Sequence, residues 1–183
     1  GDGKSRVELL VRPRYANVMR FQNSSNITIR NLTAGHTEES GSCVGGVFVF
    51  ENTAGVVVEN TRLFGSGTQG LELLNVRNFR FESGSIEDCT YHTLTVEGSE
   101  DIHFARSVFT RNREYSQINV RKSHGVVLDQ VEITSNVADE ALFSLEASKV
   151  ILKNSRVANN RASALLHEGS GSRFENLNNK MES

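Results

Sequence analysis

Four side chains in this sequence have the types needed for acid–base chemistry: Glu72, Glu97, His92 and Arg121. The two glutamates fall in adjacent copies of the repeat described below, and they are offset along the chain direction. Two carboxyl groups offset in this way lie within the separation that inverting glycoside hydrolases use for their acid and base. Many unrelated carboxylate pairs meet the same criterion, so a carbohydrate-active lyase or glycoside hydrolase is one of several alternatives.

Two tyrosines offer a surface for binding rather than for reaction. Tyr91 and Tyr115 each stand three residues before an apolar position that recurs in successive repeats. Their rings are therefore expected to stack about 4.8 Å apart and to present aromatic faces to the apolar faces of sugars. The expected binding strip also includes Asn119, Glu97 and Arg121. The competing interpretation is a filled aromatic ladder beside a surface ion pair between Glu97 and Arg121.

A repeat of about 23 residues must position these side chains. Its reference positions are apolar and are separated by 22 to 29 residues. They are Ile29, Val58, Phe81, Phe104, Leu128, Leu152 and Phe174. A second apolar column lies ten residues earlier, at Met19, Phe48, Leu71, Leu94, Ile118, Leu142 and Ala164. A period this regular is typical of a solenoid.

The local pattern within each repeat is that of strands. Apolar and polar residues alternate at 27–29, 79–81 and 102–104, which is the period of a strand with one buried face. A third apolar column lies five residues past the reference position, at Leu63, Ile86, Phe109, Ile133 and Val157. Leucine-rich repeats have a similar period but need a leucine framework that is missing here. The sequence predicts an all-β parallel β-helix of about seven coils with three short strands per coil.

Asparagines mark the expected bend between the second and third strands of each coil. They follow a reference position by two residues and are Asn31, Asn60, Asn154 and Asn176. Asparagine tolerates left-handed backbone angles, and stacked amides can form hydrogen bonds along the solenoid axis. Ser83, Arg106 and Gln130 interrupt the ladder in the middle coils.

Together these features resemble the right-handed parallel β-helices of the pectin-lyase-like superfamily. The resemblance covers residues from about Met19 to Leu177 and depends on the period and the asparagine ladder. It implies a right-handed β-helix and an extracellular, periplasmic or cell-surface location among polysaccharides. It transfers no catalytic residues, because the aspartates are scattered, no Asp-Asp pair occurs, and Pro13 is the only proline available for an Asp-Pro-His-Asp run. We expect neither a metal nor a cofactor.

Composition and charge narrow the function further. Residues 1–183 are expected to form a single β-helix domain that is part of a longer native protein. The net charge is −2 with both signs interspersed, which argues against a nucleic-acid partner. No apolar run has the length of a membrane span.

Three further predictions concern regions outside the tyrosine strip. Phe143, Leu145 and Leu165 flank the assigned first-strand positions and are expected to form an exposed apolar patch for self-association or a partner. Cys43 and Cys89 share a position two coils apart, roughly 10 Å, so both are expected to be free thiols. The surplus residues 35–42, which include His36, are expected to form a solvated loop.

The favoured function is a non-catalytic β-helix domain of a secreted or surface protein. It would bind a glycan or a protein partner along the outward face of the first strands. The alternatives are the lyase or glycoside hydrolase that uses Glu72, Glu97, Arg121 and His92, and a structural spacer or assembly module.

Overall fold

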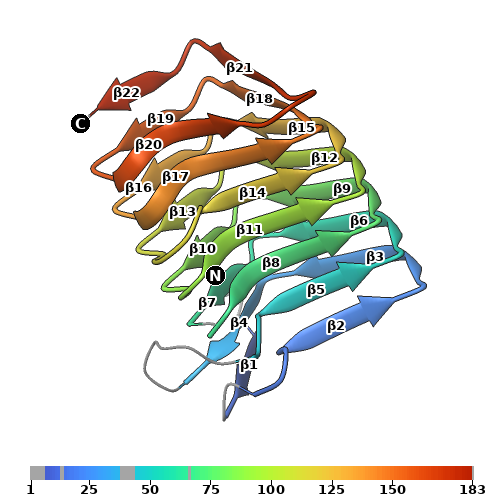
Figure 1. Ribbon diagram of the computed structural model, residues 1–183. Helices are drawn as coiled ribbons and strands as arrows, with labels where there is room; N and C mark the ends of the chain where they lie inside the picture. Colours follow the sequence, from blue (N-terminus) through green and yellow to red (C-terminus); the bar gives the residue numbers. More distant parts are fainter. Residues whose placement is uncertain (1–6, 13–14, 38–43, 66, 183) are drawn as a thin grey trace, which may run out of the picture.

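A computed structural model describes residues 7–12, 15–37, 44–65 and 67–182. Within these ranges the chain forms 22 β-strands and no helix, and it winds as a right-handed parallel β-solenoid of about seven turns. Each turn adds one strand to each of three parallel sheets, which rise along the axis (Figure 1). The predicted all-β fold with three strands per coil is confirmed.

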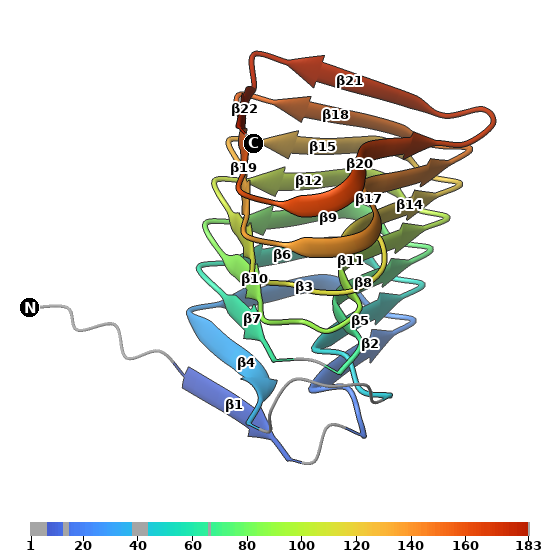
Figure 2. The ribbon, with the colours of Figure 1, turned by 60° about the vertical axis from the view of Figure 1, so that its left-hand side comes forward.

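The three sheets enclose the core on three sides, as the view in Figure 2 shows. The first sheet contains β2 (Met19–Gln22), β5 (Phe48–Glu51), β8 (Gln69–Leu74), β11 (His92–Glu97), β14 (Ile118–Arg121), β17 (Val137–Glu146) and β20 (Arg161–Glu168). The second sheet contains β3 (Ser25–Arg30), β6 (Ala54–Glu59), β9 (Arg77–Glu82), β12 (Glu100–Ala105), β15 (His124–Asp129), β18 (Lys149–Lys153) and β21 (Arg173–Leu177). The third sheet contains β1 (Val7–Val11), β4 (Leu32–His36), β7 (Arg62–Phe64), β10 (Ser85–Glu87), β13 (Val108–Thr110), β16 (Glu132–Thr134), β19 (Arg156–Ala158) and β22 (Lys180–Glu182).

The interior is filled by the apolar columns of the repeat. In the second sheet Val58 pairs with Phe81, and Phe81 with Phe104, so equivalent side chains stack in the core. All three are at most 1% exposed. Burial of each such side chain stabilises the fold by about 1.5–3 kcal/mol relative to exposure, so the columns supply most of the driving force.

The bends between the second and third sheets adopt the predicted left-handed conformation. Asn31, Asn60 and Asn154 have φ angles of 55°, 46° and 51°. The Asn60 amide also donates to the Asn31 side-chain oxygen at 2.6 Å, as expected of an amide ladder. The three residues that interrupt the ladder, Ser83, Arg106 and Gln130, have positive φ angles as well. The backbone at this corner is therefore left-handed whichever side chain it carries.

A second asparagine ladder lies inside the corner between the third and first sheets, and the sequence analysis did not identify it. The Asn112 side-chain amide donates to Asn136 Oδ1 at 3.0 Å, and that of Asn136 donates to Asn160 Oδ1 at 2.9 Å. Asn112 and Asn136 are at most 1% exposed. Their amides also satisfy the Ile86 and Phe109 carbonyl oxygens, so the ladder meets the hydrogen-bonding needs of a buried corner.

The predicted apolar patch is wrong. Ile118 pairs with Phe143, not with Leu142, because β17 carries one more residue than the preceding coil and its register with β20 shifts between Ala138 and Ala141. One step of register moves a strand's side chains to the opposite face. Phe143 and Leu145 are consequently core residues, 0% and 1% exposed.

The third member of that patch is exposed but stands without the other two. Leu165 is 39% exposed and lines a hollow with Leu142, Val157 and Met181 at the last coil. The self-association predicted through Phe143, Leu145 and Leu165 therefore lacks two of its three side chains.

The register of the last coil also differs from the prediction. Leu152 pairs with Asn176, whereas Phe174 pairs with Val150, two residues before the reference position. The left-handed residue of this coil is accordingly Asn178, with a φ of 55°, instead of Asn176. Phe174 still packs on Phe143, with ring centroids 5.0 Å apart.

A further expectation, that His36 belongs to a solvated loop, is wrong. His36 is the last residue of β4 and is 1% exposed, with its Nε2 3.0 Å from the Ala16 carbonyl oxygen, so it is not a loop residue. Cys89 is buried, at 1% exposed, and Cys43 lies outside the described residues, so the expectation of two free thiols stays a prediction. The described part of the chain contains no helix with the length and apolar character that a membrane span requires.

The buried ladder predicts a large stability difference between two asparagine positions. Asn136→Ala removes a side chain that accepts from Asn112 N and donates to the Phe109 carbonyl oxygen in the preceding coil, so we expect it to lower the free energy of unfolding by about 2–4 kcal/mol. Asn52→Gly is the control, because it keeps a left-handed backbone and removes only an exposed ladder amide. Urea unfolding measures both, and equal losses would contradict the structural role of the buried ladder.

Candidate functional site

The outward face of the first sheet brings the predicted site residues together. Glu72 of β8 pairs in register with Thr95 of β11, and Thr95 pairs with Asn119 of β14. Two residues further along the strands, Glu97 stands beside Arg121. The offset predicted between Glu72 and Glu97 is therefore present, because they occupy adjacent strands and differ by two positions.

The ion pair expected between Glu97 and Arg121 is not formed. Arg121 Nε instead lies 3.0 Å from Glu146 Oε2 of β17, on the far side from Glu97. Both Arg121 and Glu146 are exposed, so the pair contributes no more than about 1 kcal/mol. Glu97 is left half-buried beside Glu72.

Glu72 has an electrostatic environment that differs from that of an exposed glutamate. Partial burial raises its pKa above the ordinary value; Arg20 opposes the shift, while Glu51 and Glu97 add to it. Because burial disfavours the charged form, Glu72 keeps its proton to a higher pH than an exposed glutamate does. It is the carboxyl group on this face best suited to donate a proton.

Thr95 lies at the centre of the predicted strip and is only 8% exposed although its side chain faces outward. Its Oγ1 has no hydrogen-bond partner among the described residues. A buried hydroxyl without a partner costs free energy, so it is a group that gains from a polar neighbour.

Tyr91 and Tyr115 are in contact, but not as parallel rings. Their ring centroids are 5.2 Å apart at an interplanar angle of 79°, which is an edge-to-face arrangement. His92 completes the cluster, with its ring 5.7 Å from that of Tyr115. Tyr115 is 47% exposed. The predicted proximity is thus confirmed, and the predicted stacking is replaced by a cluster with one accessible aromatic face.

The loop that carries Tyr115 has an uncommon backbone conformation. Glu114 and Tyr115 are consecutive left-handed residues, with φ angles of 56° and 42°. Gln117, which is fully buried, anchors the loop by donating from Nε2 to the Glu114 and Val137 carbonyl oxygens at 2.8 and 2.9 Å. Thr93 Oγ1 donates a hydrogen bond of 2.9 Å to Oε1 of the same Gln117 side chain. A left-handed tyrosine costs conformational energy, and surrounding structure has to fix it in place.

His92 is oriented by the neighbouring coil. Its Nδ1 is hydrogen-bonded to the Ser116 carbonyl oxygen. A carbonyl oxygen can only accept, so Nδ1 carries the hydrogen, and in the neutral ring Nε2 is the nitrogen that can accept a proton or a hydrogen bond.

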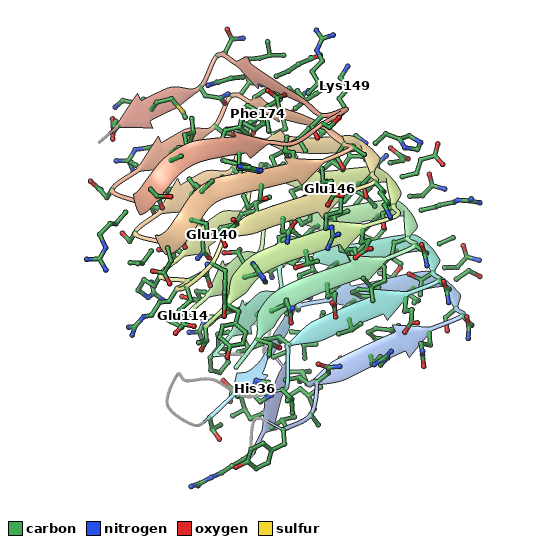
Figure 3. The ribbon with its side chains drawn as sticks, viewed as in Figure 1. His36, Glu114, Glu140, Glu146, Lys149 and Phe174 are labelled. Atoms are coloured by element: carbon green, nitrogen blue, oxygen red, sulfur yellow. The ribbon has the colours of Figure 1, made fainter. Side chains whose placement is uncertain are left out.

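A polar groove of about 480 Å³ lies next to the tyrosine cluster. Its polar lining residues are Ser116, Asp139, Glu140, Ser144, Ser163 and His167. Glu140 Oε2 accepts a hydrogen bond from Ser116 Oγ at 3.0 Å, which links the groove to the tyrosine loop. Figure 3 shows Glu114 and Glu140 on the same side of the molecule, at the edge where the first-sheet strands begin.

Sequence reasoning missed most of this groove. Asp139 and Glu140 lie in the irregular part of β17, between the two alanines where the register shifts, so no column predicted their position. The adjacent acidic residues within an otherwise apolar strand were the one available signal. Among the described residues, no cluster of three or more His, Cys, Asp or Glu side chains could hold a metal ion.

The raised pKa of Glu72 predicts a pH-dependent stability. The folded state binds more protons than the unfolded state above the ordinary value of 4.5, so this group's contribution to stability falls as pH rises through the raised pKa. Glu72→Gln removes that loss, and we expect its Tm relative to wild type to be up to about 2 °C higher at pH 7 than at pH 4. Thermal unfolding at both pH values measures this. Glu8→Gln controls for the loss of one exposed carboxylate, and a Tm difference independent of pH would refute the explanation.

Comparisons with known proteins support the fold. The crystal structure of the periplasmic alginate epimerase AlgG is similar with a TM-score of 0.57 and 11% identity, over 91% of this chain and 42% of the epimerase. The tailspike protein gp49 from Pseudomonas phage LKA1 matches with a TM-score of 0.36 and 11% identity, over 96% of this chain and 46% of the tailspike. The chain thus spans less than half the length of either protein. At 11% identity the likeness to the epimerase concerns the fold alone, and the tailspike match carries no argument.

Sequence comparison gives the family. No curated protein is detectably similar in sequence. The family model described as the right handed beta helix region matches residues 45–183, which is more than half of the chain. The matched segment begins just before β5 and includes every coil that contributes to the tyrosine cluster and the groove. On this match, the chain belongs to the right-handed β-helix family.

Proposed function

We propose that this β-helix is a glycan-binding domain of a secreted or surface protein, and that it binds without catalysing a reaction. The observation that carries the proposal is the Tyr91–His92–Tyr115 cluster, which is linked through Ser116, the residue after Tyr115, to the groove that Ser116 and Glu140 line.

The chemistry of the cluster suits a saccharide. A sugar ring has an apolar face of C–H groups and a rim of hydroxyls. Tyr115 offers an exposed aromatic face for the first. Ser144, His167 and the carboxylate of Glu140 offer donors and acceptors for the second, within one groove. An aromatic platform beside convergent polar groups is therefore present in adjacent coils.

The fixed backbone around the cluster also favours binding. The Gln117 side-chain amide donates to the Glu114 and Val137 carbonyl oxygens and so fixes the loop to the next coil. Tyr115 is therefore held in place before a ligand arrives. A ligand that meets a preorganised surface loses less free energy to ordering of side chains.

The enzyme remains the second candidate, and one observation favours it. Partial burial raises the pKa of Glu72 above its ordinary value, and the half-buried Glu97 occupies the adjacent strand. Such a pair would supply a general acid and a general base or nucleophile. Against this role, the sequence carries none of the catalytic motifs expected from its superfamily resemblance.

The location proposed for the protein is extracellular, periplasmic or at the cell surface. The support is the likeness in fold to an epimerase described as periplasmic. A protein partner on the same face and a purely structural spacer are the other outcomes that the binding experiment separates.

The first experiment measures binding and cleavage together. The purified chain is incubated with a panel of acidic and neutral polysaccharides, and bound fraction and released oligosaccharides are followed by mass spectrometry. We expect binding without release. Release that is lost in Glu72→Gln or Glu97→Gln would establish the enzyme, whereas neither binding nor release would favour the spacer or a protein-binding role.

The tyrosine cluster gives the matching mutational prediction. Replacing Tyr91 and Tyr115 together by alanine is expected to weaken binding of the tightest saccharide by about tenfold or more, because one good aromatic contact is worth about 1 kcal/mol or more. Isothermal titration calorimetry measures the change. Tyr15→Ala, which removes a tyrosine that is 72% exposed in another part of the chain, is the control. An equal loss in the control and the double variant would contradict the site.

A further inference from the structure

Three arginines gather around a hollow at the corner between the third and first sheets. The hollow has a volume of about 340 Å³ and is lined by Arg111, Arg113, Ser135, Val137 and Arg161. All three arginines are exposed.

The stacking of coils explains why these side chains meet. Arg113 N donates to the Cys89 carbonyl oxygen, Val137 N to that of Asn112, and Arg161 N to that of Asn136. Arg113, Val137 and Arg161 therefore occupy one position in three successive coils. The backbones of Arg113 and Arg161 are about 10 Å apart, with the short side chain of Val137 between them. Two long cationic side chains flanking a short one leave the hollow open.

The charges at this corner are not balanced. Arg111 is compensated, because it forms ion pairs with Glu87 and Asp88, and its hydrogen bond with Asp88 raises its pKa. Glu87 also pairs with Arg62. In the described part of the chain, by contrast, no acidic side chain forms an ion pair with Arg113 or Arg161.

The remaining acidic groups near the hollow have other surroundings. Glu140 is engaged by Ser116 Oγ and, with Asp139, lines the neighbouring groove rather than this one. Glu114 follows Arg113 directly, in the left-handed part of the loop. The lining of the hollow itself contains no carboxylate. Two guanidinium groups without an acidic partner at one hollow can bind an oxyanion, since arginine presents a planar array of donors that fits oxyanions.

We infer that this hollow binds one anionic group, a carboxylate or a sulfate ester, carried by the saccharide that lies on Tyr115. The connection is the loop itself, because Arg113, which lines the hollow, is two residues before Tyr115, and Ser116, which follows Tyr115, lines the groove. The inference rests on the proposed function and narrows it, from a glycan in general to an acidic one. Arg113 and Arg161 set the specificity.

A matched pair of saccharides tests the inference. The probes are a hexasaccharide of galacturonic acid and the same hexasaccharide with its carboxyl groups methyl-esterified, titrated into the full chain by calorimetry. We expect the acid to bind at least about tenfold more tightly than the ester, and the preference to weaken at high salt. Replacing Arg113 and Arg161 together by glutamine should reduce the preference to below about threefold while ester binding stays unchanged.

Control variants separate the anion site from the sugar site. Arg80→Gln removes an exposed arginine on the second sheet and should leave the acid preference intact. The Tyr91→Ala, Tyr115→Ala variant should weaken acid and ester by a similar factor, because it removes the aromatic platform and not the charge. An acid preference that survives Arg113→Gln with Arg161→Gln overturns the inference and leaves the proposed function standing.

A second readout covers the outcome in which neither hexasaccharide binds. Inorganic sulfate is titrated while the arginine Nε–Hε resonances are followed by NMR. Saturable shifts at Arg113 and Arg161, but not at Arg80, support the anion site. If these shifts occur without saccharide binding, the proposed function has failed for this class of glycan while the anion site stands. If all three arginines shift alike, the anion site is overturned.

Discussion

Hydrogen bonding between successive coils is the constraint on which the rest of this structure depends. Each strand inside a sheet satisfies its backbone groups with the coils before and after it, so every coil must turn its corners at the same places. The corners achieve this with a left-handed residue and with short polar side chains that meet the next coil. Ser99 Oγ accepts from Val76 N, Ser123 Oγ from Ser99 N, and Ser148 Oγ from Ser123 N, all within 3.0 Å.

The same constraint creates the candidate site. Side chains from one position of different coils stand side by side at intervals of about 4.8 Å, so distant residues meet without any long-range folding of loops. Tyr91 and Tyr115 are brought together in this way, and so are Arg113 and Arg161. The surface of a β-helix therefore consists of columns of side chains from equivalent positions in successive coils. Neighbouring columns bring aromatic, hydroxyl and charged groups together on one face.

The columns were predictable wherever the coils have nearly equal lengths. The inward positions from Met19 to Ile118 and the bends at Asn31 and Asn60 follow from the period, because the two-residue alternation fixes which side chains are buried. In the first-strand column the prediction failed after Ile118, whereas Leu128 with Leu152 and Ile133 with Val157 still pair as predicted. An inserted residue in β17 turns Phe143 inward and Glu140 outward, and the acidic pair Asp139 and Glu140 was its one local sign. The hollow lined by the three arginines could not be predicted either. Its residues lie at a corner, where the alternation of apolar and polar residues that marks a strand stops.

The buried ladder of Asn112, Asn136 and Asn160 has a consequence for how such a protein changes during evolution. Asn112 and Asn136 make the same bonds to the coil before and the coil after, and Asn160 repeats the bond to the coil before. A duplication or an in-frame loss of the segment between two of these residues rejoins equivalent partners. The solenoid then lengthens or shortens by one strand spacing, about 4.8 Å, while every remaining corner keeps its contacts. Gene segments that encode one coil are in this sense interchangeable units. The length of a binding surface along the solenoid axis can therefore change by one coil at a time.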